Sequence, residues 1–213
     1  MPGEPRTLVW PTAEAEQRAV AEAAAEVLRA GGLVVYPTDT VYGLGADPSQ
    51  SAAIRRIYEV KGRPDQKAII WLVDEARSAS RWCEMDLAAE RLAERFWPGA
   101  LTLVLRRLEP PQGELPTLGV RVPAHAAALA IIKAAGGVVA TTSANASGAP
   151  SARTAGEARA QIGEGVDLII DAGPAPRGTE STVIDMTVDP PKLLRAGAIS
   201  VEEIEAALGV RLE

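Results

Sequence analysis

The sequence of 213 residues contains one cysteine, one histidine and few aromatic side chains, which make up 4% of the chain. A single cysteine, Cys83, excludes an intrachain disulfide and a cysteine-rich zinc site. His125 stands directly before an apolar helical run and is interpreted as a helix-start or surface residue rather than a catalytic base. We therefore predict no metal site built from His and Cys ligands. With so few aromatic residues, the core must consist mainly of Ala, Val, Leu and Ile.

The chain also has no long hydrophobic run and no basic-plus-apolar leader. No apolar run approaches the roughly 20 residues that a membrane-spanning helix needs. We expect a cytoplasmic protein that does not enter the membrane. The formal charge is −6, from 22 basic and 28 acidic residues. This charge argues against a broad nucleic-acid-binding surface, but it leaves room for a local basic cleft.

Apolar strands alternate with helical segments along the whole chain. Strands are predicted over 33–37, 68–73, 101–106, 119–123, 138–141, 166–173, 181–186 and 192–197, and helices over 11–32, 51–62, 74–82, 86–96, 125–137 and from 154 and 200 onward. Wholly apolar strands are typical of a sheet that is covered on both faces. The pattern predicts the fold class α/β, with a twisted, open sheet of mixed and parallel strands and helices packed on it. We expect one domain over residues 1–213, with its core at about 13–208 and no appended C-terminal domain.

Polar clusters follow several predicted strands, at the edge where ligands bind in open α/β sheets. In the first cluster, Thr38, Asp39 and Thr40 stand between an apolar strand and an expected glycine turn. The others are "KGRP", "TTSANASGAPS", "GTEST" and "LLRAG". Each cluster alone is typical of an ordinary turn. Together they favour an anionic small-molecule ligand held by hydroxyl, amide and backbone N–H groups. The familiar phosphate-loop, dinucleotide and nucleophile-elbow motifs are absent from the sequence.

Seven motifs, in this order, carry a resemblance to a known family: "GGLVVYPTDTVYGLGAD", "KGRP", "WPGALTLVL", "GVRVP", "TTSANASG", "GTESTVID" and "LLRAG". They resemble the YrdC family of threonylcarbamoyl-AMP synthases, in its short single-domain form. The resemblance implies a YrdC-like fold with a large basic cavity. It also implies a nucleotidyltransferase that converts L-threonine, bicarbonate and ATP to L-threonylcarbamoyl-AMP and pyrophosphate. The product would serve the threonylcarbamoyladenosine modification of tRNA beside the anticodon.

The resemblance further implies roles for individual residues. Threonine would be held by Thr38, Thr40, Arg121, Thr141 and Ser181, and ATP by Arg63, Lys67, Thr117, Ser143, Asn145, Ser151 and Arg195. No protein nucleophile is expected, because a threonine carbamate would attack the α-phosphate itself. Lys61 and Arg63 would then contribute most to positioning and charge stabilisation.

The same resemblance implies the remaining substrates and partners. Mg²⁺ would arrive on the ATP phosphates with few protein ligands, so no metal-binding residue is assigned, and no organic cofactor is expected. The partners would be separate threonylcarbamoyl-transfer proteins and tRNA or double-stranded RNA, with no membrane. Two positions depart from part of the family: Leu72 stands where some members have histidine, and Lys67 where many have asparagine.

Two alternative functions stay open. The first is an RNA-binding or translation-associated module without turnover, and the second is a paralogue that uses another carbamoyl substrate. The acidic total charge and the lack of an aromatic stacking platform count against the RNA module. The motifs "GTEST" and "GVRVP", which would hold threonine, favour the synthase over the paralogue.

Overall fold

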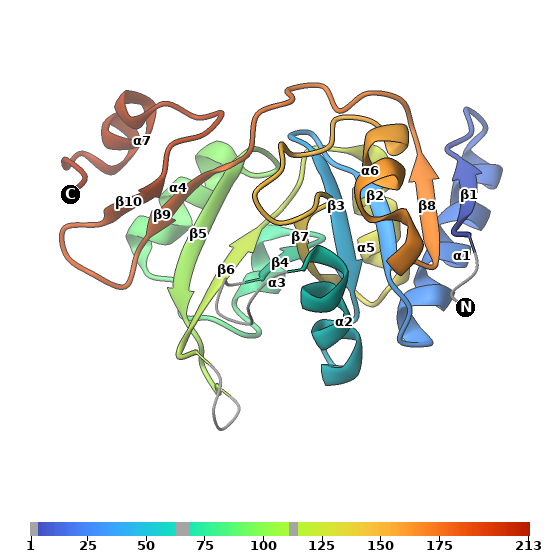
Figure 1. Ribbon diagram of the computed structural model, residues 1–213. Helices are drawn as coiled ribbons and strands as arrows, with labels where there is room; N and C mark the ends of the chain where they lie inside the picture. Colours follow the sequence, from blue (N-terminus) through green and yellow to red (C-terminus); the bar gives the residue numbers. More distant parts are fainter. Residues whose placement is uncertain (1–3, 63–68, 111–114) are drawn as a thin grey trace.

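The computed structural model describes residues 4–62, 69–110 and 115–213, which form a ten-stranded sheet with helices on its faces (Figure 1). The strands are β1 (Arg6–Val9), β2 (Val34–Pro37), β3 (Tyr42–Ala46), β4 (Ile70–Val73), β5 (Leu101–Arg106), β6 (Thr117–Arg121), β7 (Val138–Ser143), β8 (Leu168–Asp171), β9 (Thr182–Asp185) and β10 (Lys192–Arg195). The helices are α1 (Glu14–Arg29), α2 (Ser51–Lys61), α3 (Ala76–Ala79), α4 (Leu87–Phe96), α5 (Ala126–Ala134), α6 (Ala155–Ile162), the short 3₁₀ turn η1 (Gly163–Gly165) and α7 (Val201–Leu208).

The strand order across the sheet is β1-β8-β2-β3-β7-β4-β6-β5-β9-β10. The pairs β1–β8, β2–β8, β4–β6 and β5–β9 are parallel, and the other neighbours are antiparallel. The predicted α/β class with a mixed, open sheet is therefore confirmed. Strands far apart in the sequence become neighbours, and the two ends of the chain lie at opposite ends of the sheet (Figure 1).

Helices cover both faces of the sheet, as the wholly apolar strands predict. On β2, Val34 packs in a cluster with residues of α1 and α5, whereas Val35 packs with residues of α2 and α6. Successive strand residues point to opposite faces, so these two helix pairs lie on opposite sides of the sheet. A third cluster joins α4 and α7 to β5, β6 and β9.

A glycine turn was predicted after Thr40, and this prediction was wrong, because the segment 42–46 is a strand. It forms β3, which is buried and pairs with both β2 and β7. A Cβ atom at Gly45 would lie only 2.7 Å from Cε1 of Tyr36 and 2.8 Å from Cγ1 of Val139. Glycine is needed here because side chains of the two neighbouring strands lie over the backbone of β3.

Other differences lie in the helices and at the sheet edge. The helix expected over 74–82 is a single turn, α3, because the chain leaves it to form a β-bridge between Cys83 and Arg107. The edge strand β1 was not predicted, since its mostly exposed residues give no buried apolar pattern. His125 occupies the N-cap position of α5, so its interpretation as a helix-start residue is confirmed.

Candidate functional site

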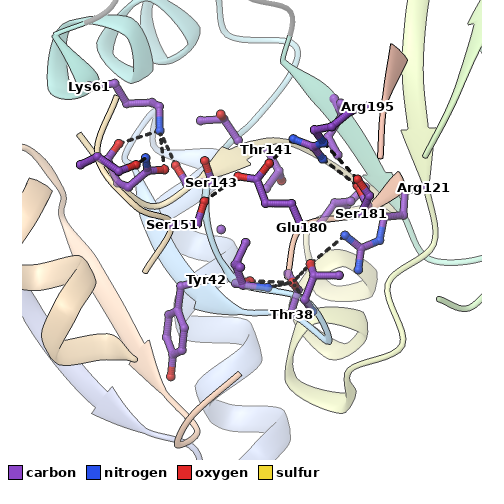
Figure 2. Close-up of a pocket in the computed structure, with 18 of the residues that line it drawn as sticks. Thr38, Tyr42, Lys61, Arg121, Thr141, Ser143, Ser151, Glu180, Ser181 and Arg195 are labelled. Carbon is purple, nitrogen blue, oxygen red and sulfur yellow. Dashed lines mark hydrogen bonds and ion pairs between the residues drawn. The ribbon is translucent and has the colours of Figure 1, made fainter. Parts of the chain in front are cut away.

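A cavity of about 370 Å³ lies where the β2–β3 turn, the end of β7 and the end of β6 meet. Its volume is in the range of small-molecule sites. Its lining consists of Thr38, Thr40, Val41, Tyr42, Gly43, Lys61, Ile70, Leu72, Arg121, Thr141, Thr142, Ser143, Asn145, Ser147, Gly148, Ala149, Ser151, Glu180, Ser181 and Arg195. Figure 2 shows that these side chains come from distant parts of the chain.

Most of the residues that the sequence assigned to a site meet in this cavity. They are Thr38, Thr40, Lys61, Arg121, Thr141, Ser143, Asn145, Ser151, Ser181 and Arg195. Thr117 begins β6 at the end remote from Arg121 and is not part of the lining. Arg63 and Lys67 lie outside the described residues. The structure thus brings the predicted residues together, while the ligand that each one binds stays a prediction.

Arg121, the last residue of β6, is 3% exposed and is held from three directions. Its Nε donates to the carbonyl of Gly99 at 2.7 Å, its Nη1 to Oγ1 of Thr40 at 2.9 Å and its Nη2 to Oδ1 of Asp39 at 2.5 Å. Burial lowers the pKa of the guanidinium, and the nearby Asp39 carboxylate opposes this shift. The two remaining N–H groups of Arg121 have no partner among the described residues, so a planar donor is available to an anion in the cavity.

Fixed hydroxyl groups stand near Arg121. The hydroxyls of Thr38 and Thr40 are 2.9 Å apart, and Thr38 also donates to the carbonyl of Val41 at 2.6 Å. On the neighbouring strand β7, Oγ1 of Thr141 lies 2.6 Å from the phenol oxygen of Tyr36. Burial raises the pKa of the Tyr36 phenol, which therefore stays protonated. These hydroxyls form a polar wall whose orientation is set by the protein before any ligand binds.

Lys61 lies on the opposite side of the cavity from Arg121 in Figure 2. It is the last residue of α2 and is 4% exposed. Its ammonium group donates to the carbonyl of Ser143 and, at 2.7 Å, to the carbonyl of Asn145. The Asn145 amide in turn donates to the carbonyl of Ala149 at 2.7 Å. Lys61 and Asn145 together fix the loop after β7, which carries much of the polar lining.

Arg195, at the end of β10, lines the cavity and contacts two other lining residues, Glu180 and Ser181. Its Nη1 pairs with the Glu180 carboxylate, its Nε donates to the carbonyl of Ser181 at 3.0 Å and its Nη2 to the Ser181 hydroxyl at 3.0 Å. The hydroxyl of Ser151 donates to the other oxygen of Glu180 at 2.5 Å. Glu180 was not among the predicted site residues, although the cluster "GTEST" contains it.

The described residues contain no group of three or more His, Cys, Asp or Glu side chains that would hold a metal ion. A cation that entered the cavity on a ligand would meet the Glu180 carboxylate and the hydroxyls of the lining. In the same described ranges, no helix has the length and apolar character that crossing a membrane requires.

The fold and the cavity define a class of α/β proteins with a mixed sheet and a polar, cation-lined binding site. Residues 26–197 match the model of the Sua5/YciO/YrdC family, whose description is "Telomere recombination". The chain therefore belongs to the Sua5/YciO/YrdC family.

Individual relatives agree with this assignment. Over 191 residues the chain is 45% identical to a threonylcarbamoyl-AMP synthase of Pyrococcus abyssi, which corresponds to 87% of this chain and 56% of that protein. A relative from Mycobacterium leprae is 39% identical over 209 residues, 95% of this chain and 94% of that protein. The crystal structure of P. abyssi Sua5 complexed with L-threonine superimposes with a TM-score of 0.90 at 40% identity, over 98% of this chain and 62% of that chain. The chain thus spans little more than half the length of the P. abyssi proteins.

Proposed function

We propose that the protein is a threonylcarbamoyl-AMP synthase, an adenylate-forming enzyme that converts L-threonine, bicarbonate and ATP to L-threonylcarbamoyl-AMP and pyrophosphate. One observation carries the proposal: a single cavity holds a buried guanidinium beside fixed hydroxyls on one side and a lysine-organised polar loop on the other. The 45% identity to the threonylcarbamoyl-AMP synthase of P. abyssi and the likeness to P. abyssi Sua5 in complex with L-threonine support the same function.

In this proposal the amino acid binds at the Arg121 side of the cavity. The two N–H groups of Arg121 that have no partner among the described residues suit a carboxylate, because a guanidinium and a carboxylate pair through two parallel hydrogen bonds. The hydroxyls of Thr38, Thr40, Thr141 and Ser181 are near enough to line the same subsite. A threonine bound there would meet polar groups that are already in place, which lowers the entropy cost of binding.

ATP would occupy the rest of the cavity, with Ser143, Asn145 and Ser151 as its contacts on the Lys61 side and Arg195, which contacts Ser181, as its contact next to the amino-acid subsite. Arg63, Lys67 and Thr117 complete the predicted nucleotide contacts. Mg²⁺ bound to the phosphates would neutralise part of their charge. Glu180 and the neighbouring hydroxyls fit such a cation, since Mg²⁺ usually keeps several waters and takes only one or two carboxylates from the protein.

The chemistry proposed for this geometry needs no protein nucleophile. An oxygen of the threonine carbamate forms a bond to the α-phosphorus, and the bond from that phosphorus to the bridging oxygen of pyrophosphate breaks. The protein contributes by orienting both reactants and by placing cations where negative charge develops. Lys61 would act by holding the Ser143–Asn145 loop against the phosphates, together with the predicted contribution of Arg63.

The wider role is also part of the proposal. The product would pass to separate transfer proteins that modify tRNA in the cytoplasm, and tRNA or double-stranded RNA would contact the enzyme at most transiently. An acidic chain with a formal charge of −6 fits a small-molecule substrate better than a permanent RNA partner.

The test is pyrophosphate release from ATP and bicarbonate, measured with and without L-threonine and with L-serine as the control. We expect release that depends strictly on threonine. ATP binding without threonine-stimulated release would favour the paralogue with another carbamoyl substrate. Salt-sensitive tRNA binding without any ATP binding would favour the RNA module and overturn the proposal.

A further inference from the structure

Glu180 is the one acidic side chain in the lining of the cavity, as far as the described residues show. Figure 2 places it between Ser151 and Arg195, and it contacts both. An acid is an unexpected component of a site for a triphosphate, because the phosphates and the carboxylate carry charge of the same sign. The presence of Glu180 therefore has to be explained by the charge of the ligand that binds in the cavity.

The cationic side chains of the cavity differ in the partners that they contact. Lys61 donates to the backbone carbonyls of Ser143 and Asn145 and to the side-chain oxygen of Asn145. Arg121 is paired with the buried carboxylate of Asp39, behind the cavity wall. Arg195 is paired with Glu180 inside the cavity. A nucleotide phosphate that approaches Arg195 thus meets a guanidinium whose charge is balanced by an adjacent carboxylate.

We propose that Glu180 makes nucleotide binding depend on a divalent cation: it disfavours free ATP and accepts ATP that carries Mg²⁺. The inference rests on the proposed function and names a specificity-determining residue of that same site. Free ATP brings only negative charge toward Glu180, and like charges placed together in a binding site are costly. The magnesium complex brings a cation that a Glu180 oxygen can face, directly or through one of the waters that Mg²⁺ retains.

The contacts of Glu180 are compatible with this role. Each carboxylate oxygen can accept more than one hydrogen bond or cation contact, so Glu180 can keep Arg195 and Ser151 while facing a metal ion. Its side chain is 33% exposed, and that of Arg195 is 44% exposed, so solvent and ligands reach the pair. If Glu180 served only to hold Arg195 and Ser151 in place, its removal would weaken free ATP and magnesium-bound ATP to the same degree.

The experiment measures the Kd of ATP by calorimetry in excess MgCl₂ and in excess EDTA, at constant ionic strength. The proteins are the wild type, Glu180→Gln, Glu180→Asp and Glu202→Gln. Glu202→Gln removes one negative charge from the exposed first turn of α7 and is the matched control. Thermal unfolding of each variant establishes that it is folded before binding is measured.

We expect the wild type to bind magnesium-bound ATP at least about tenfold more tightly than free ATP. Free ATP places its phosphates against the Glu180 carboxylate, and this contact between like charges is costly, whereas Mg²⁺ on the phosphates offsets it. Glu180→Gln should bring the two Kd values close together, mainly by tightening the binding of free ATP. Glu180→Asp retains the charge and should retain the cation dependence, and Glu202→Gln should behave as the wild type.

Other outcomes separate this inference from the proposed function. If the wild type binds both forms equally, or if Glu180→Gln keeps the full cation dependence, the role of Glu180 is overturned while the synthase proposal stands. An equal weakening of both forms would make Glu180 a residue that only positions Arg195, which also overturns the inference. A wild type that binds no ATP under either condition would overturn the proposed function as well.

Discussion

Arg121 and Asp39 form a buried ion pair, with Nη2 of the arginine 2.5 Å from Oδ1 of the aspartate and side chains that are 4% and 6% exposed. The backbone N–H of Ala124 donates to the same oxygen at 2.9 Å. The other oxygen, Oδ2, is buried without a hydrogen-bond partner among the described residues, and Nε of Arg177 lies 4.0 Å from it. Such a pair fixes the guanidinium in one orientation, at the cost of removing both charges from water.

We predict that Arg121→Met destabilises the protein strongly. The substitution leaves the Asp39 carboxylate buried without its cation, and breaking a buried pair in this way costs about 3–5 kcal/mol. The free energy of unfolding, measured by urea denaturation, should fall by this amount. The double variant Asp39→Asn/Arg121→Met should regain part of the loss, because no unpaired charge is then buried. A single variant as stable as the wild type would show that the pair opens to water in solution.

Lys61→Met should impair nucleotide binding through the loop that Lys61 holds. Without the ammonium group, the carbonyls of Ser143 and Asn145 lose a charged donor, and an unsatisfied buried carbonyl costs about 1–3 kcal/mol. We expect a comparable loss in the free energy of unfolding and a higher Kd for ATP, measured by calorimetry. Lys133→Met, at an exposed position on α5, is the control and should change neither quantity. An unchanged Kd for ATP in Lys61→Met would separate this loop from the nucleotide subsite.

Gly45→Ala should be destabilising although it adds only a methyl group. The new Cβ would lie 2.7 Å from Cε1 of Tyr36, inside a sheet whose strands cannot move apart independently. Overpacking of this kind typically costs about 1–3 kcal/mol. Gly156→Ala provides the contrast, since its Cβ meets nothing nearer than 3.9 Å and the position lies in the helix α6. Thermal unfolding should show a lower Tm for the first variant and an equal or higher Tm for the second.

The sequence alone was sufficient for the α/β class and for most strands, because wholly apolar runs such as 33–37 are typical of a sheet that is covered on both faces. It failed at 42–46, where the glycines of β3 gave a turn signal but serve close packing instead. A glycine pattern does not distinguish these two uses, because the side chains that lie over β3 come from Tyr36 and from Val139, about a hundred residues further along the chain.

For the candidate site, the sequence predicted lining residues but not the charge partners of these residues. Motif resemblance selected Arg121, Lys61 and Arg195, all of which line the cavity. It did not identify Asp39 or Glu180 as their charge partners, since pairing across the fold depends on the strand order and not on sequence spacing. A cluster of polar residues at a strand end therefore indicates where a ligand binds, but the contacts within the cluster require the tertiary structure.

Cys83 should be almost inert to alkylation in the native state. Burial raises the pKa of its thiol to about 11, with the nearby Arg107 opposing the shift. At about pH 8 the thiolate fraction is then roughly a thousandth, and only the thiolate reacts. Because folding raises the pKa of the Cys83 thiol, the native state holds the thiol proton more tightly than the unfolded state does. The stability that depends on this proton is fully present below pH 9 and is lost between about pH 9 and pH 11. Iodoacetamide labelling in buffer and in urea should differ by orders of magnitude; fast labelling in buffer would show that the region around Cys83 opens.

Leu72 offers a test of where the amino-acid side chain lies. It is 1% exposed, lines the cavity and pairs in register with Arg121, so it offers an apolar surface beside the proposed carboxylate site. If the threonine methyl group packs against it, Leu72→Ala should lower the preference for threonine over serine, by about tenfold or more, as expected for one methyl contact in an apolar pocket. The measurement is the ratio of kcat/KM for the two amino acids in pyrophosphate release, because partial unfolding lowers both values and leaves their ratio unchanged. An unaltered ratio would place the methyl group away from Leu72, on the side of the cavity formed by the hydroxyls of β7 and the β2–β3 turn.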